Sequence, residues 1–240
     1  MRHLLLPITV LAVLFTGAWG PRGHESSNRA AVRGIPADGP VFLKEYEDWI
    51  AATGPLPDNW RGNSEPYSKI FEDPNHGWFK EQFSCMTEIP RSRYEFVIRL
   101  YDEYLRIKDK DPKRAELMNV RWTGTMPYAV IENYDRMKAA MRQYRTASAD
   151  KTAESQARAR FLAQDIAFYM GWLGHYTADG AQPLHDTIHH DGWQGENPQG
   201  YTTDPRVHGR IETAFVDLIQ LTDADLSPLM TKPQVLNDPF

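Results

Sequence analysis

Apolar residues along most of the chain recur at three- and four-residue spacing, which is the period of an amphipathic helix. The spacing predicts helices over 41–52, 92–109, 126–144, 153–179 and 207–222. No two segments alternate apolar and polar residues as paired strands do, and no repeat or domain boundary interrupts the series. We therefore expect an all-α fold: a single-domain multi-helix bundle with long ordered loops. The predicted loops are residues 54–90 and 186–205, which are rich in Gly, Pro and Asn.

Two of the predicted helices show which side chains should be buried. In 153–179 the apolar positions at helical spacing predict a buried face, and in 207–222 a shorter inward stripe follows the same rule. The residues of the first face are Phe161, Leu162, Ile166, Tyr169, Met170 and Leu173, and those of the second are Ile211, Phe215 and Ile219.

The N-terminus has the pattern of an export signal. Arg2 precedes an apolar run from Leu4 to Phe15, and Thr16-Gly17-Ala18 supplies a small-x-Ala cleavage site. We expect residues 1–18 to be a signal peptide and 19–240 to be the exported domain, in a periplasm or outside the cell. A retained N-terminal anchor is the alternative. The run is too short to span a bilayer comfortably, so an integral membrane protein is not expected.

Charge and cysteine content narrow the function classes. The formal net charge is −5, so the chain lacks the basic surplus of a duplex-DNA-binding module. The single cysteine, Cys85, excludes an intrachain disulfide framework. In an oxidising compartment we expect Cys85 to be a buried small apolar residue.

The histidines carry the chemical signal. His175 and Asp179 are four residues apart on a predicted helix, and His208 and Glu212 repeat that spacing on another. Pro183 breaks the first helix, so His185 can turn back toward the same site. One such pair is often only a surface hydrogen bond, but two pairs plus His185 indicate a site for several metal ions. Imidazole and carboxylate ligands suit zinc, with iron or manganese as alternatives.

The predicted mature N-terminus adds a further donor. A free α-amine has a pKa of roughly 7.7–8.0, so the Trp19 amine can be neutral near physiological pH and bind a metal. The amine and carbonyl of Trp19 would close a five-membered chelate ring. His24 is close enough in sequence to share that metal.

Together these residues resemble a known family. The order Trp19-Gly20-x-x-Gly23-His24, His175-x3-Asp179-x5-His185 and His208-x3-Glu212 is similar to the zinc-dependent phospholipase C and single-strand-specific nuclease superfamily. The resemblance covers essentially the whole mature chain and implies an all-helical fold with three Zn²⁺. It implies ligand sets of Asp58, His76, His175 and Asp179 for one zinc, of His185, His208 and Glu212 for a second, and of Trp19, His24 and a bridging Asp179 for the third.

The resemblance also implies a function. It indicates a secreted zinc-dependent phosphodiesterase acting on single-stranded nucleic acid or on a phospholipid headgroup, with no obligate protein partner. Glu212 is typical of the phospholipase branch and the short spacing from Trp19 to His24 of the nuclease branch, so the branch stays open. Asp58 would orient or deprotonate the attacking water. Asp73 is the competitor of Asp58 as a ligand, and Asp58 is favoured because the family spacing to the next histidine is nearer fifteen residues than three.

Candidate substrate contacts follow from neighbours of these ligands. Arg61 is a candidate phosphate contact or a surface arginine. Trp78 and Phe79 could stack a base or line a headgroup pocket, although core aromatics are the more common role of such residues. His189 and His190 are left over and are expected in a loop at the mouth of the site.

Two other functions compete with this one. A di-iron or di-manganese oxidase normally uses Glu-x-x-His pairs, whereas here histidine comes first and the spacing is four. A catalytically silent zinc-binding protein of the same fold is the non-enzyme alternative.

Overall fold

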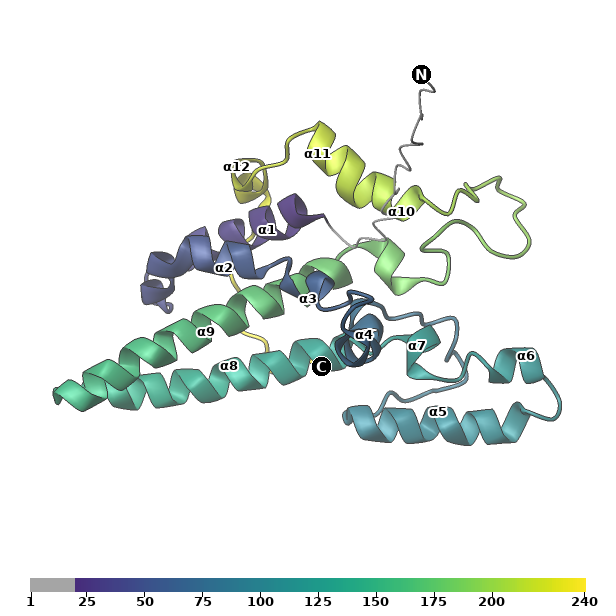
Figure 1. Ribbon diagram of the computed structural model, residues 1–240, viewed down its shortest axis with the longest axis horizontal. Coiled ribbons are helices and arrows are strands. Elements are labelled where there is room, and N and C mark those ends of the chain that lie inside the picture. The colour runs from purple at the N-terminus through teal and green to yellow at the C-terminus, as the bar shows by residue number, and fades with distance from the viewer. Residues whose placement is uncertain (1–19) are drawn as a thin grey trace, which may run out of the picture.

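The computed structural model describes residues 20–240, and its regular structure is helical (Figure 1). This confirms the all-α prediction; within the described range the one β contact is an isolated bridge between Trp78 and Gly124. The predicted signal peptide and Trp19 lie outside the described residues. The helical elements are α1 (Pro21–Arg33), η1 (Val41–Tyr46), α2 (Glu47–Thr53), α3 (Leu56–Asn59), α4 (Pro66–Glu72), η2 (Asp73–His76), α5 (Arg93–Ile107), α6 (Pro112–Ala115), α7 (Val120–Thr123), α8 (Met126–Ala149), α9 (Ala153–Gly180), η3 (Pro183–Asp186), α10 (Val207–Gly209), η4 (Arg210–Phe215), α11 (Val216–Leu218), α12 (Asp223–Leu226) and η5 (Ser227–Leu229).

A long helical hairpin of α8 and α9 is the scaffold of the molecule, and Figure 1 shows the two helices side by side. α9 begins where the sequence predicted, because the Thr152 side chain accepts a hydrogen bond from the Ser155 backbone N–H and caps the helix. α8 begins at the predicted residue and runs five residues further than expected. Of the predicted buried face of α9, Leu162 and Ile166 are buried, whereas Phe161 is 67% exposed, so its prediction was wrong.

The N-terminal helices pack unusually close to α9. The Asn28 side-chain amide of α1 donates to the carbonyls of Ile50 (3.0 Å) and Gly171 (3.1 Å), which ties α1, α2 and α9 together. A Cβ on Gly174 would collide with the Asn28 side-chain oxygen, so only glycine allows this approach. His24 lies one turn before Asn28, and His175 lies one turn after Gly171. The close contact therefore brings two distant histidines together.

The segment 54–90, predicted as an ordered loop, contains helical turns. It contains α3, α4 and the 3₁₀ turn η2, and each has a proline in its first turn. Similarly, the predicted helix over 41–52 begins as the 3₁₀ turn η1 before α2. Short proline-started turns have too little periodicity for the sequence pattern to reveal them. They matter because α3 presents Asp58 and η2 presents His76.

The predicted helix over 207–222 is helical, but its orientation was predicted wrongly. Ile211, Phe215 and Ile219 are exposed, while Glu212 and Val216 are buried. A π-helical turn, η4, replaces regular α-helix in its middle. The inward face carries the polar pair His208 and Glu212, so the apolar residues face outward.

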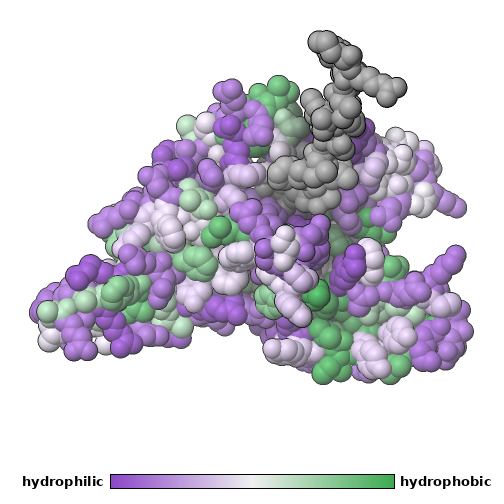
Figure 2. All heavy atoms as spheres, in the orientation of Figure 1, coloured by the Kyte–Doolittle hydropathy of each residue, from purple (hydrophilic) through white to green (hydrophobic). Residues whose placement is uncertain are grey.

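The surface carries further apolar residues. Figure 2 shows apolar side chains at the lower edge of this face of the molecule, over α4 and α5, where Ile70, Phe71 and Ile98 are exposed. Cys85 is also exposed rather than buried as predicted, and its thiol lies beside Glu103. No helix within 20–240 has the length and hydropathy needed to cross a membrane.

Candidate metal centre

Three groups of histidine and carboxylate side chains meet where α1, α3, η2, α9, η3 and α10–η4 converge. In each group the possible ligand atoms lie within 4.8 Å of one another, so each could hold a metal ion. The groups are His24, His175 and Asp179; Asp58, His76 and His175; and His185, His208 and Glu212. Every predicted metal ligand within the described residues belongs to one of them.

The first two groups share His175 and are enclosed by protein except at Asp58, whose side chain is 23% exposed. His175 and Asp179 are 0% exposed, and their i, i+4 spacing on α9 places His175 Nε2 3.3 Å from Asp179 Oδ2. Asp179 Oδ1 lies 3.6 Å from His24 Nε2 and 3.7 Å from His185 Nε2. Asp179 therefore lies between all three groups. The resemblance implied that Asp179 would link two sites, and the structure adds that His175 is shared as well.

Asp58 joins the same enclosure from α3. Its Oδ1 lies 3.6 Å from His76 Nε2, and its Oδ2 lies 3.7 Å from His24 Nε2. Asp73 instead pairs with Arg61 (3.0 Å) and Lys69 (3.1 Å). The geometry therefore favours Asp58 over Asp73 as the carboxylate of this group.

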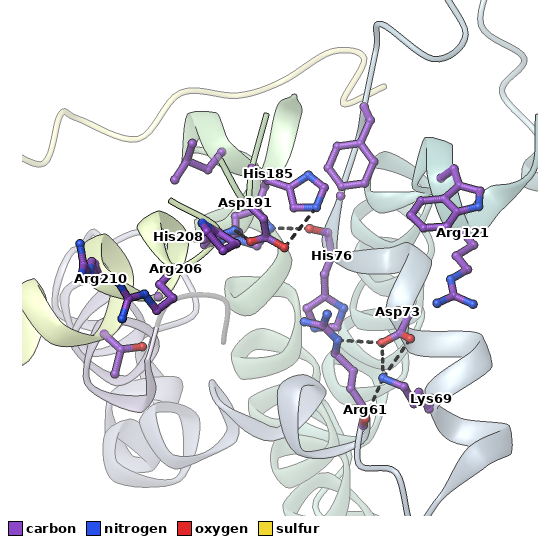
Figure 3. A pocket seen from close by; sticks show the side chains of 18 of the residues that line it. Arg61, Lys69, Asp73, His76, Arg121, His185, Asp191, Arg206, His208 and Arg210 are labelled. Atoms are coloured by element: carbon purple, nitrogen blue, oxygen red, sulfur yellow. Dashed lines mark hydrogen bonds and ion pairs between the residues drawn. The ribbon is translucent and has the colours of Figure 1, made fainter. Parts of the chain in front are cut away.

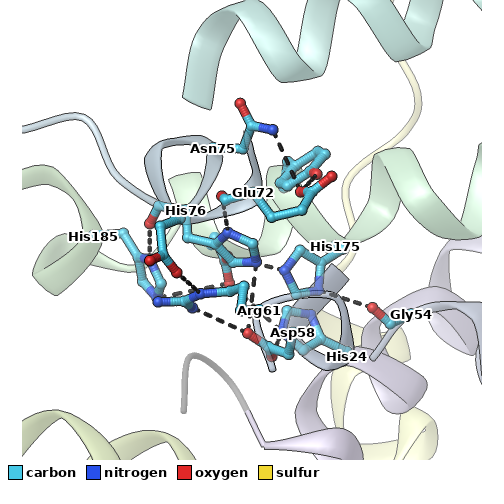
Figure 4. A network of polar contacts seen from close by, with 12 residues as sticks. His24, Gly54, Asp58, Arg61, Glu72, Asn75, His76, His175 and His185 are labelled. Atoms are coloured by element: carbon cyan, nitrogen blue, oxygen red, sulfur yellow. Dashed lines mark hydrogen bonds and ion pairs between the residues drawn. The ribbon is translucent and has the colours of Figure 1, made fainter. Parts of the chain in front are cut away.

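Backbone carbonyls fix the orientation of three of the imidazoles (Figure 4). His76 Nδ1–H donates to the Glu72 carbonyl and His175 Nδ1–H to the Gly54 carbonyl, both at 2.8 Å, and His185 Nδ1–H donates to the His76 carbonyl. In the neutral form of each ring, the proton on Nδ1 leaves a lone pair on Nε2. This is the arrangement by which metal-binding histidines are held in one tautomer.

The enclosed atoms lack partners of their own. Seven buried side-chain nitrogens and oxygens have no hydrogen-bond partner within residues 20–240; they belong to His24, His76, His175, Asp179 and Glu212. Where two of them approach, as His175 Nε2 and Asp179 Oδ2 do, the alignment of a hydrogen bond is missing. Buried polar atoms are normally satisfied, so a cluster of unsatisfied donor atoms requires an explanation. A set of metal ligands provides one.

Burial and neighbouring charges shift the pKa values of the enclosed histidines and carboxylates. Burial lowers the pKa of His24 and of His76 well below the usual value, so both imidazoles are neutral. Burial also opposes ionisation of Asp179, but His175 and His185 outweigh it and hold the pKa of that carboxyl well below its usual range. Burial, together with the charge of Asp179, raises the pKa of Asp58 against the opposing effect of His175.

The members of the third group already contact one another, and of the three only His208, with a side chain 14% exposed, is partly open to solvent. His208 Nε2 lies 2.7 Å from Glu212 Oε2, and His185 Nε2 lies 3.2 Å from Glu212 Oε1. Burial disfavours the cation at His185, but Asp179 and Glu212 outweigh it and raise the pKa of His185 to about 9. The Gln182 amide also donates to Glu212. Sequence reasoning missed Gln182, whose place three residues before His185 gave no chemical signal.

A cavity of about 580 Å³ opens beside the histidines, within the size range of small-molecule sites. Phe79 lines it and stacks on the ring of His190 at 4.7 Å. Trp78 does not line it: this side chain is 8% exposed and packs in the core with Phe83 and Phe96. The suggested substrate contact by Trp78 is thus corrected to a core role. His189 and His190 lie in the loop after η3, as expected.

Arg61 takes a position consistent with its candidate role. It lines the cavity, and its guanidinium lies 3.3 Å from Asp58 and 3.0 Å from Asp73. These contacts place a cation at the edge of the enclosed groups.

Comparisons with protein-family models, curated proteins and solved structures find no match for this chain.

Proposed function

We propose that the protein is a zinc-dependent phosphodiester hydrolase that binds three Zn²⁺ in these three groups. The observation that carries the proposal is the cluster of buried, unpartnered nitrogen and oxygen atoms. Within residues 20–240, these imidazole nitrogens and carboxylate oxygens have no hydrogen-bond partner. Their donor types are those that zinc prefers in proteins.

The residues present fit such a set of ions. His24, His175 and Asp179 would hold one ion, Asp58 and His76 would hold a second with His175 or Asp179, and the third group would hold another. Backbone carbonyls at His76, His175 and His185 hold the rings ready for binding, which lowers the cost of ordering them. When bound, zinc supplies Lewis acidity, which acidifies water and neutralises charge on phosphate oxygens.

The chain's own side chains would carry out the remaining tasks. Asp58 is positioned to accept a proton from water at the edge of the enclosed groups, and burial raises its proton affinity. Hydrolysis forms a bond from water oxygen to phosphorus and breaks an ester P–O bond, and the departing alcohol takes up a proton. Arg61, beside Asp58, would bind a phosphate oxygen.

The N-terminus is a further part of the proposal. The Gly20 backbone N–H donates to the Glu212 carbonyl at 3.1 Å, so α1 begins next to the third group. The resemblance assigns the Trp19 amine as a ligand with His24, and both ring nitrogens of His24 lack hydrogen-bond partners among residues 20–240. Cleavage after Ala18 would create that amine, and an uncleaved leader would hold it as an amide.

The test combines metal content and turnover. Protein with a verified Trp19 N-terminus is analysed for metals and then assayed with bis(p-nitrophenyl) phosphate, a minimal phosphodiester. Near three zinc per chain with metal-dependent hydrolysis is the expected result. Three zinc without hydrolysis of any phosphodiester would favour the catalytically silent alternative. Absence of stoichiometric metal would contradict the proposal as a whole.

A further inference from the structure

Cations line both sides of the cavity next to the metal centre. Figure 3 shows Arg206 and Arg210 on one side of the histidines, and Lys69 and Arg121 on the other. With Arg61, five basic side chains line the cavity, against the two carboxylates of Asp73 and Asp191. The whole chain has a net charge of −5, so this surplus is local. Such a cleft concentrates anions before any metal is counted.

Four of these five cations form ion pairs with carboxylates, whereas within the described residues Arg121 does not. Arg206 and Arg210 both pair with Asp204, at 3.0 and 2.7 Å. Arg61 and Lys69 both pair with Asp73. Within the described part of the chain, no carboxylate forms an ion pair with the Arg121 guanidinium, which lies 5.1 Å from the centre of the Trp122 ring. Arg121 thus offers its full charge to a ligand in the cavity.

Trp122 gives this side of the cavity a flat apolar surface. Its side chain is 43% exposed although it lines the cavity. The Arg121 guanidinium lies over this ring. The pair suits a nucleotide, because a base stacks on the exposed part of the ring while its phosphate meets the guanidinium. A choline or ethanolamine headgroup suits it poorly, because Arg121 repels the ligand's cation. Phosphatidylcholine and phosphatidylethanolamine also have a single phosphate, so the cations on the far side would meet no second phosphate.

We infer that Arg121 and Trp122 bind the nucleotide adjacent to the bond being cleaved, and that the substrate class is single-stranded nucleic acid. The inference rests on the proposed phosphodiesterase function. Arg121 contacts the neighbouring phosphate and Trp122 stacks its base. Arg206 and Arg210 face the strand on the other side of the histidines. Duplex is excluded because its bases are already stacked on one another.

The test compares a substrate that reaches this subsite with one that does not. The variants are Arg121→Ala, Trp122→Leu and Trp122→Phe, and Arg145→Ala is the matched control. Arg145 is an exposed arginine on α8 that does not line the cavity, so its removal changes the net charge equally. Each protein is assayed with a single-stranded octanucleotide, with bis(p-nitrophenyl) phosphate and with phosphatidylcholine vesicles.

Arg121→Ala should lower kcat/KM for the octanucleotide by about tenfold or more, and Trp122→Leu by a similar factor. Trp122→Phe should keep most of the activity because it keeps a stacking surface. The Arg121 and Trp122 variants should lower kcat/KM for bis(p-nitrophenyl) phosphate by a smaller factor than for the octanucleotide, and Arg145→Ala should change neither. Equal losses on both substrates, or no loss on the octanucleotide, would overturn the inference while leaving the proposed function in place.

A binding measurement gives a second readout that needs no turnover. Fluorescence anisotropy follows a labelled octanucleotide binding to chelator-treated protein at several salt concentrations. Arg121→Ala should weaken binding and reduce the slope of log K against log salt by about 0.7, the value for one phosphate contact on a single strand. Hydrolysis confined to phosphatidylcholine, with binding unchanged in Arg121→Ala, would overturn the inference. If no substrate is hydrolysed, the proposed function fails, and the salt slope still decides whether the subsite exists.

Discussion

The two enclosed ligand groups and the third group use the same residue types in different surroundings. In the enclosed groups the imidazole Nε2 atoms and the Asp179 oxygens are buried and face one another without hydrogen-bond partners within residues 20–240. In the third group His185, His208 and Glu212 already form close contacts, and His208 lies at the cavity wall. The enclosed groups thus have unmet interactions without metal, whereas the third group can partly satisfy itself. We expect metal to stabilise the first region more than the second.

The shared ligand gives the largest expected effect. His175→Ala removes a donor from both enclosed groups, so metal content should fall by about two ions per chain and hydrolysis by at least about a hundredfold. The melting temperature should fall by roughly 5–10 °C because metal binding contributes to folding. Elemental analysis and calorimetry measure both. His189→Ala is the control, since His189 belongs to no group; a similar loss there would contradict the assignment.

A change in the third group should have a smaller effect on stability. His208→Ala should cost about one metal ion and lower hydrolysis strongly, but should shift the melting temperature by only about 2 °C or less. The reason is that His185 and Glu212 retain their mutual contact, together with the Gln182 amide. A destabilisation as large as that of His175→Ala would break the distinction between the two regions.

Removal of metal in steps should reveal the same distinction. A chelator should remove one ion early from the third group, whose His185, Glu212 and Gln182 keep contacts with one another without metal, and the others more slowly from the enclosed groups. Aliquots taken over time are analysed for zinc and for melting temperature. Most of the stability loss should accompany the slow phase. Simultaneous release of all ions would mean that the groups act as one cooperative cluster.

The pH dependence of metal uptake is the smallest expected effect, and it concerns the third group specifically. Metal needs neutral His185, whose pKa is about 9 without metal, so a proton competes below that pH. Apparent affinity at the third group should therefore rise by up to about tenfold per pH unit between pH 7 and 9 and level off above. In Glu212→Gln the rise should end at lower pH, because one of the carboxylates that raises the pKa of His185 is gone. Zinc titrations across this range test it, and an affinity independent of pH would refute it.

The sequence predicted the helices with long apolar repeats and the ligands with helical spacing. α9 has both, and its bounds, His175 and Asp179 followed directly from the pattern. The buried face of the helix that carries Glu212 was predicted wrongly. Its inward face is made of ligands, so Ile211, Phe215 and Ile219 lie outside. α3 and η2 were missed because short turns have no period. Arg121 and Trp122 were missed because only the fold places α7 against the cavity.

The close packing of α1 on α9 has a consequence for how the protein tolerates mutation. In a library of single substitutions scored for activity, Asn28, Gly171 and Gly174 should be as intolerant as the ligands although none of them offers a donor to a metal. A map of such intolerance would extend from the centre along the contact between α1 and α9. Redesign of the cavity should therefore start from α7 and the loop after η3, and leave this contact unchanged.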